Sequence, residues 1–187
     1  MNRTLDFHSF HVPTPTFDSV SAESARLESA FERATTADER SAAIQDWDQL
    51  RRRLETWESL TNLRFQQDTS NTEYKQAREY LDELRPKLTE LEVRMKRKLV
   101  GSPHRAELQR QFGPQAFALW EADILTYDPV IEADMVREAK LQADYTELLA
   151  AAKLQFQGET LNHSGITKFR EHADRDVRHG AEQVRWG

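Results

Sequence analysis

Apolar residues recur at helical spacing throughout residues 72–100, and this stripe constrains the fold more than any other feature of the sequence. The steps between its members alternate between three and four residues, which places them along one face of a single helix. At about 1.5 Å per residue the helix is roughly 40 Å long, so it needs an equally long apolar partner. The stripe consists of Tyr74, Ala77, Leu81, Leu84, Leu88, Leu91, Met95 and Leu99.

The preceding segment, from Asp38 to about Asp68, has a matching stripe and can supply that partner. Thr36 with Glu39 three residues later predicts a capping box at its start. The short polar break 68–71 then favours an antiparallel helical hairpin. Pro86 removes a backbone donor, so we expect it to kink the second arm. The stripe of the first arm consists of Ile44, Trp47, Leu50, Leu54, Trp57, Leu60 and Leu63.

Shorter elements are expected before and after the hairpin. Residues 1–17 contain prolines and scattered aromatic residues without helical period, which predicts an extended arm. Asp18 or Ser19 can cap a helix over about 19–34. After the hairpin, glycine and proline positions predict helices over 103–111, from Pro114 to about 126, and over 129–153. The last of these has Leu141, Tyr145, Leu148 and Ala152 on one face.

The pattern changes after the last long helix. Residues 154–157 alternate apolar and polar side chains, and Gly158 follows, so we predict a small β-hairpin near 153–162. A short helix near 164–171 and a helix capped by Asp174 complete the chain. The predicted fold is mostly all-α, a bundle of long antiparallel helices with one small β-hairpin. We divide it into an arm (1–17), a helical domain (18–152), and a hairpin with the start of a following, truncated helical region (153–187).

Composition excludes several classes of protein. The net charge is -6, which gives no electrostatic footprint for nucleic acid. The basic residues Arg94, Lys96, Arg97 and Lys98 stand at a predicted helix end, where they complement the helix dipole. No cysteine is present, so disulfides and thiolate zinc sites are absent. No stretch is long and apolar enough to span a membrane, and we expect a cytoplasmic protein.

No set of residues predicts a metal or catalytic site. A catalytic zinc usually has two histidines four residues apart on one helix, with a carboxylate. His8 and His11 lie in the arm and are interpreted as solvated. None of His163, His172 and His179, near the C-terminal end, stands in a His-Glu-x-x-His arrangement, and Glu171-His172 has the two residue types in the reverse order. We therefore interpret these three histidines as surface residues. We therefore predict no catalytic, cofactor-binding or metal-binding residue in this chain.

Two further groups of residues have ordinary structural interpretations. The carboxylate pairs Asp46 with Asp48 and Asp82 with Glu83 fall on the polar faces of the two long helices, so we expect them to be solvated. Trp47 and Trp57 lie on the apolar stripe. We interpret both as core residues, with a role as ligand platforms as the alternative. A glycine-rich phosphate loop and a Gly-x-Ser-x-Gly turn are both missing.

A succession of spaced residues resembles a known family over roughly 13–186. The resemblance is to the N-terminal part of oligoendopeptidase F-type zinc metallopeptidases, which are related to thimet oligopeptidase. No single piece is diagnostic, and the specificity comes from the order of the pieces. They are Trp47-x-x-Leu50-Arg51, Arg64-x-x-x-Asp68-Thr69, Tyr74, Glu83-x-x-Pro86, Glu138-x-x-Leu141-x-x-x-Tyr145-x-x-Leu148, Phe156-x-Gly158-Glu159 and Asp174-Arg175-x-Val177-Arg178.

This resemblance implies a mostly helical enzyme that encloses a channel and cleaves short peptides. In the family, zinc is held by His-Glu-x-x-His and a downstream glutamate, and the motif glutamate activates the water. This chain lacks that motif, so we expect no zinc bound to it and no activity alone. The implied role is a wall of the substrate channel, and the implied partners are the C-terminal catalytic region of the same polypeptide and short peptide substrates.

Two interpretations stay open at this point. In the first, the chain is the non-catalytic N-terminal portion of a zinc oligoendopeptidase, present as an expressed fragment or a truncated gene product, which its ending just inside a helix favours. In the second, it is a stand-alone helical interaction or oligomerisation protein without catalysis, whose apolar stripe binds a partner or a second copy.

Overall fold

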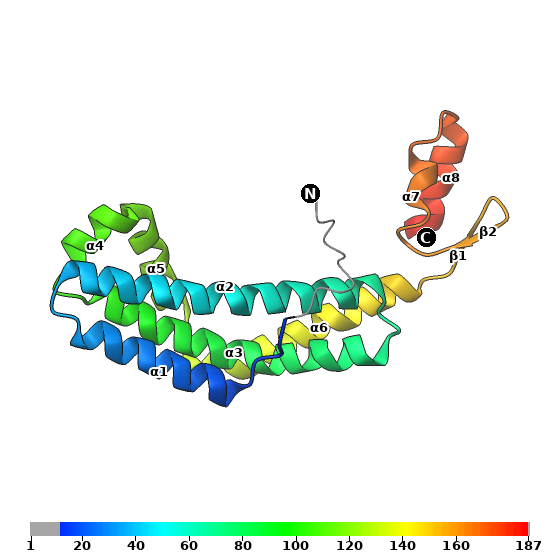
Figure 1. The fold of residues 1–187 in the computed structure, drawn as a ribbon. Helices are drawn as coiled ribbons and strands as arrows, with labels where there is room; N and C mark the ends of the chain where they lie inside the picture. The colour runs from blue at the N-terminus through cyan, green and yellow to red at the C-terminus, as the bar shows by residue number, and fades with distance from the viewer. Residues whose placement is uncertain (1–11, 187) are drawn as a thin grey trace, which may run out of the picture.

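Three long helices lie side by side and form the body of the molecule (Figure 1). The computed structural model describes residues 12–186. Helices α1 (Phe17–Arg33), α2 (Ala37–Gln67) and α3 (Thr72–Val100) each contact the other two. A fourth helix, α6 (Glu132–Ala151), runs along α3. The predicted mostly-α bundle is therefore confirmed.

The central helical hairpin forms where the sequence places it. Thr36 Oγ1 accepts a hydrogen bond from the Glu39 amide at 3.2 Å, and the Glu39 carboxylate accepts one from the Thr36 amide at 3.2 Å, which completes the predicted capping box of α2. Asn71 caps α3 by accepting hydrogen bonds from the next turn, at 2.9 Å from the Glu73 amide. Each arm therefore starts at a residue whose side chain satisfies otherwise unpaired backbone donors.

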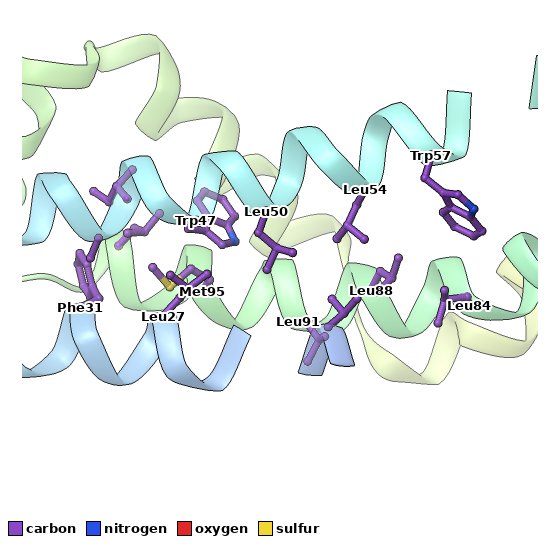
Figure 2. Close-up of a cluster of buried hydrophobic side chains, with 14 of the residues drawn as sticks. Leu27, Phe31, Trp47, Leu50, Leu54, Trp57, Leu84, Leu88, Leu91 and Met95 are labelled. Carbon is purple, nitrogen blue, oxygen red and sulfur yellow. The ribbon is translucent and has the colours of Figure 1, made fainter. Parts of the chain in front are cut away.

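The two stripes face each other and form the core together with α1 (Figure 2). On α3 the stripe is buried from Leu81 to Leu99, as predicted. On α2 it departs from the prediction after Trp57, because Thr61 and Phe65 are buried and Leu63 is exposed. Each residue turns a helix by about 100°, so repeated steps of three rotate away from the core while steps of four from Trp57 stay near it.

Helix α1 begins two residues earlier than predicted. Its cap is Thr16, not Asp18 or Ser19, and Thr16 and Ser19 form a reciprocal capping box. The prediction overlooked Ser19 as the partner at the third helical position, a place where glutamate is more usual. Residues 1–11 of the predicted arm lie outside the described residues. The helix α3 continues without a break through Pro86, which is buried, and the expected kink stays a prediction.

Two short helices cross one end of the bundle (Figure 1). Helix α4 (Arg105–Phe112) starts two residues later than the predicted range, and α5 (Pro114–Thr126) starts at its proline as predicted. Gly113 joins them with a φ of +88°, a conformation that glycine adopts without steric cost. After a 3-10 turn, η2 (Pro129–Ile131), the chain enters α6 and returns along the bundle.

The segment 154–186 folds beyond the end of α6, and we call it the C-terminal lobe (Figure 1). Strands β1 (Leu154–Phe156) and β2 (Glu159–Leu161) pair antiparallel, which confirms the predicted β-hairpin. Its turn has positive φ at Gln157 and Gly158, the geometry that favours tight hairpins. Helices α7 (Thr167–Arg170) and α8 (Arg175–Trp186) follow, and Asp174 accepts a hydrogen bond from the Asp176 amide at 2.8 Å as the predicted cap. The elements of the lobe chiefly contact one another.

Candidate functional site

The histidines singled out from the sequence do not come together. The His163 ring packs edge-on against Trp186 with centroids 5.0 Å apart, and His172 Nδ1 accepts a hydrogen bond from the Asp174 amide at 3.1 Å. Within residues 12–186, no three histidine or acidic side chains are grouped closely enough to hold a metal ion. His8 and His11 lie outside the described residues. That the chain holds no metal ligand stays a prediction.

A cleft of about 630 Å³ lies between α2 and α5, and we call it the α2–α5 cleft. Its floor is aromatic, because Trp47 of α2 meets Trp120 of α5 edge-to-face, with centroids 6.5 Å apart. Phe112 lies 6.5 Å from Trp120 and extends this surface. Trp47 is buried, as is Trp57, so the interpretation of both as core residues is correct, and Trp47 also lines the cleft.

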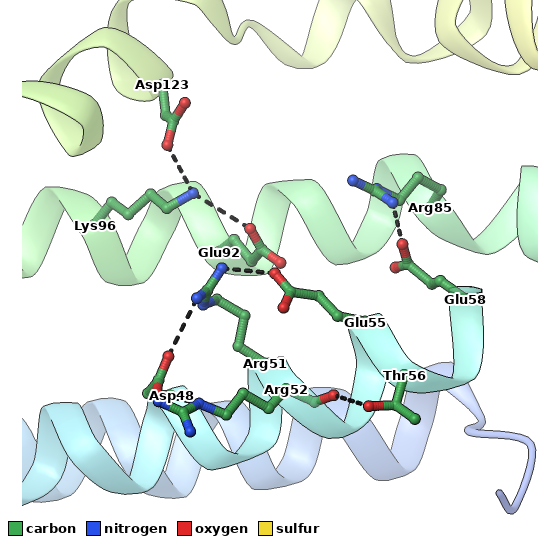
Figure 3. A network of polar contacts seen from close by, with 10 residues as sticks. All are labelled: Asp48, Arg51, Arg52, Glu55, Thr56, Glu58, Arg85, Glu92, Lys96 and Asp123. Atoms are coloured by element: carbon green, nitrogen blue, oxygen red, sulfur yellow. Dashed lines mark hydrogen bonds and ion pairs between the residues drawn. The ribbon is translucent and has the colours of Figure 1, made fainter. Parts of the chain in front are cut away.

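Charged side chains form the rim of the α2–α5 cleft (Figure 3). Arg51 pairs with Asp48 at 3.2 Å and with Glu55 at 2.7 Å along α2. Lys96 of α3, which is 12% exposed, pairs with Asp123 of α5 at 2.9 Å and with Glu92 at 3.3 Å. These cations are already neutralised by carboxylates, so the cleft has the character of a polar and aromatic binding surface and offers no activated nucleophile.

The basic residues at the end of α3 also pair with other helices. Arg94 Nε lies 2.8 Å from Glu28 Oε1 of α1, and Lys98 pairs with Glu32. Glu28 is buried, so the pair with Arg94 helps to fix α1 against α3. The lysine pair lowers the pKa of Glu32 through a hydrogen bond and raises the pKa of Lys98. These contacts add specific partners to the expected interaction with the helix dipole.

One of the four carboxylates expected to be solvated is not. Asp82 is only 13% exposed and pairs with Arg78 at 2.8 Å, and burial raises its pKa despite that pair. Asp48 is half-buried in ion pairs, whereas Asp46 and Glu83 are exposed as expected. The helix face that contains Asp82 turns partly toward the bundle, which a pattern of polar residues alone does not reveal.

Glu58 of α2 is the other carboxylate whose pKa is raised. Its side chain is 12% exposed, and burial raises its pKa although Arg85 of α3 forms an ion pair with it (Figure 3). Because the folded state then binds a proton more tightly than the unfolded state, this group stabilises the fold at low pH. That contribution is lost as the pH rises through the raised pKa.

The variant Glu58→Gln is therefore expected to have a higher free energy of unfolding than the parent at pH 7. The difference should disappear when the pH is lowered below the ordinary glutamate pKa of 4.5, where the parent carboxyl is protonated in both states. Urea titrations across this range, followed by circular dichroism, measure it. Glu83→Gln, at an exposed position on α3, is the control and should stay within about 0.5 kcal/mol of the parent. A parent more stable than Glu58→Gln at pH 7 would contradict the prediction.

A second cleft, of about 950 Å³, lies where the bundle meets the C-terminal lobe, and we call it the hairpin-tip cleft. The bend between α2 and α3 forms one side, the last two turns of α6 form another, and residues 162–164 close it. Lys75 Nζ pairs with Glu147 Oε2 at 2.7 Å across this region and ties α3 to α6. Neither cleft was predicted from the sequence, because each is assembled from segments that are far apart along the chain.

The comparison with known families decides what kind of domain this is. The family described as Peptidase M3 N-terminal domain matches residues 7–127. The chain belongs to the M3 peptidase family. This match confirms, at the level of the family, the resemblance drawn from the spaced residues. Peptidases of this family are zinc enzymes. No curated protein sequence matches the chain.

Solved structures of M3-type peptidases have the same fold along this chain. One oligoendopeptidase F structure, from crystals grown by microfluidic seeding, is 35% identical with a TM-score of 0.90, covering 98% of this chain and 32% of its own. A PZ peptidase A with an inhibitor is 34% identical with a TM-score of 0.89, and the match covers 97% of this chain and 32% of the peptidase. An oligoendopeptidase F from Bacillus anthracis is 28% identical with a TM-score of 0.90, and the match covers 100% of this chain and 34% of the Bacillus protein.

The M3 chain described here thus spans about a third of the length of those solved structures. It is an N-terminal domain of oligoendopeptidase-like M3 peptidases. None of its described helices has the length and apolar character needed to cross a membrane.

Proposed function

We propose that this chain is the non-catalytic N-terminal domain of a zinc-dependent oligoendopeptidase that hydrolyses short peptides. The observation that supports this most strongly is the match to an oligoendopeptidase F over 98% of this chain but only 32% of the other, at 35% identity. Zinc and the groups that react belong to the remaining catalytic region, which is the proposed partner. Short peptides are the proposed substrates of the assembled enzyme, and a cytoplasmic location stays a prediction.

Within that enzyme, the proposed role of the domain is to form part of the wall of the substrate channel. Support comes from its shape and chemistry, because the long hairpin of α2 and α3 provides a long, well-packed surface. The α2–α5 cleft adds aromatic and paired charged groups and no reactive set. A rigid wall restricts which substrates reach a reacting centre and leaves the chemistry to other groups. The proposed division is an arm (1–17), a helical domain (18–152) and a following region (153–187).

The isolated chain is expected to bind no stoichiometric zinc and to cleave no peptide. Metal analysis of the purified protein after zinc loading, with a quenched fluorescent peptide assay, tests this. One zinc per chain, or cleavage that scales with protein concentration, would sink the proposal.

A hybrid enzyme provides the positive test. In it this chain replaces the matched third of the 35% identical oligoendopeptidase F. The hybrid should cleave short peptides and discriminate against long ones, whereas the catalytic region without this domain should lose that discrimination. A hybrid that cleaves long and short peptides equally well would contradict the role as a channel wall.

A second candidate function is that of a stand-alone interaction protein that uses an exposed apolar surface. The observation that favours it is the exposure of Leu141, Tyr145 and Leu148 on α6. Light scattering distinguishes the two, because this candidate requires a defined oligomer of the isolated chain, whereas the first one does not.

A further inference from the structure

Helix α6 presents an apolar stripe to solvent. Leu141, Tyr145 and Leu148 follow each other at steps of four and three residues, and so lie on one side of the helix, as the sequence predicts. Their exposed fractions are 58%, 60% and 69%. No residue of α6 is fully buried, although the helix packs along α3. The stripe therefore belongs to the outward face of α6 and not to the core of the bundle.

The stripe continues into the hairpin-tip cleft. Tyr145 and Leu148 line that cleft as well as the outward face, together with Leu149 and Ala150. The Lys75–Glu147 ion pair anchors the same stretch of α6 to α3, so the apolar residues are presented on a fixed helix. A ridge of large apolar side chains beside a cleft of about 950 Å³ is the shape that receives side chains of another structural element.

The charge along this face changes toward the start of the helix. At helical spacing, Glu138 and Asp134 extend the line of Leu141, Tyr145 and Leu148, and Asp134 and Glu138 are both exposed. The ion pair that the described part of the structure shows for α6 joins Glu147 to Lys75 and involves neither of these two carboxylates. A complementary surface is apolar opposite the second half of α6 and basic opposite the first half.

The comparisons indicate what covers this face. Large apolar side chains gathered on one helix face of a soluble protein mark a binding surface. About two thirds of each matched structure lies outside the part that this chain covers, and the covered part keeps this fold at a TM-score of 0.90. We propose that the outward face of α6, with the hairpin-tip cleft, is the docking surface for the catalytic region of an M3 peptidase. This inference rests on the proposed function and adds the surface through which the two regions meet.

Because the chain contains no cysteine, single cysteines can report on this surface. The test uses Leu148→Cys and, as a matched control, Leu63→Cys, which is an exposed leucine on α2. Each is placed in the isolated chain and in the hybrid enzyme described above, whose other cysteines are replaced. The rate of maleimide labelling is measured in both settings, and light scattering gives the oligomeric state of the isolated chain.

We expect Leu148→Cys to react at least ten times more slowly in the hybrid than in the isolated chain, while Leu63→Cys changes less than twofold. Equal rates for Leu148→Cys in an active hybrid would overturn the docking surface and leave the proposed function standing. Protection in an inactive hybrid would support the docking surface and count against the function. Slow labelling in the isolated chain, together with a dimer that Leu148→Lys dissociates, would assign this face to a second copy and overturn the inference.

Discussion

Replacing Trp47 by alanine is expected to lower the free energy of unfolding by about 3–5 kcal/mol, the usual cost of removing a buried tryptophan. Trp47 is 5% exposed, sits in the core between α2 and its neighbours, and meets Trp120 of α5 edge-to-face. Its removal leaves a cavity and one fewer aromatic contact, because the long helices on either side cannot close around the gap. Urea denaturation followed by circular dichroism at 222 nm measures the change without relying on tryptophan fluorescence.

Leu63→Ala on the same helix is the matched control. Leu63 is 43% exposed and stands where the sequence stripe leaves the core, so its truncation should change the free energy of unfolding by no more than about 0.5 kcal/mol. Similar losses for the two variants would mean that α2 is rotated relative to the arrangement described. That result would also remove the aromatic floor from the α2–α5 cleft.

The hairpin of α2 and α3 could be predicted from the sequence because its signals are local and agree with one another. The capping pair Thr36 and Glu39 marks a start, the polar residues 68–71 mark a bend, and two apolar stripes of similar length supply the reason to pack. Gly158 and the alternation around it likewise sufficed for the β-hairpin. In each case the information lies within a few residues of the element it specifies.

The clefts and the outward face of α6 could not be predicted in this way. Periodicity shows that Leu141, Tyr145 and Leu148 lie on the same side of a helix. Whether that side is buried depends on how segments distant in the sequence pack, and in the structure it is exposed. The same holds for Asp82, whose polar neighbours predict a solvated side chain while the bundle leaves it only 13% exposed. The α2–α5 cleft needs residues of α2, α3, α4 and α5 together, and its advance sign in the sequence was the alternative interpretation of Trp47 as a ligand platform.

Ile166→Ala is expected to unfold the C-terminal lobe while the helical bundle stays folded. Ile166 is fully buried in the lobe, where the other packing includes buried Ala181 and the pair of Phe156 with Phe169, whose ring centroids are 5.1 Å apart. Truncating a buried isoleucine costs about 2–5 kcal/mol, and a unit of roughly 30 residues has little stability of its own to lose. Because the lobe's elements chiefly contact one another, the loss should remain local.

Hydrogen exchange read by mass spectrometry separates these two regions. Peptides from 154–186 should lose their protection in Ile166→Ala, whereas peptides from α2 and α3 should exchange as in the parent. His179→Ala, at an exposed position on α8, should leave both sets of peptides unchanged. If protection were lost in α2 and α3 as well, the lobe and the bundle would form one cooperative unit, and the proposed division near residue 153 would be wrong. Loss of protection confined to residues 154–186 would support the division near residue 153, with the lobe as a separate folding unit attached to the end of α6.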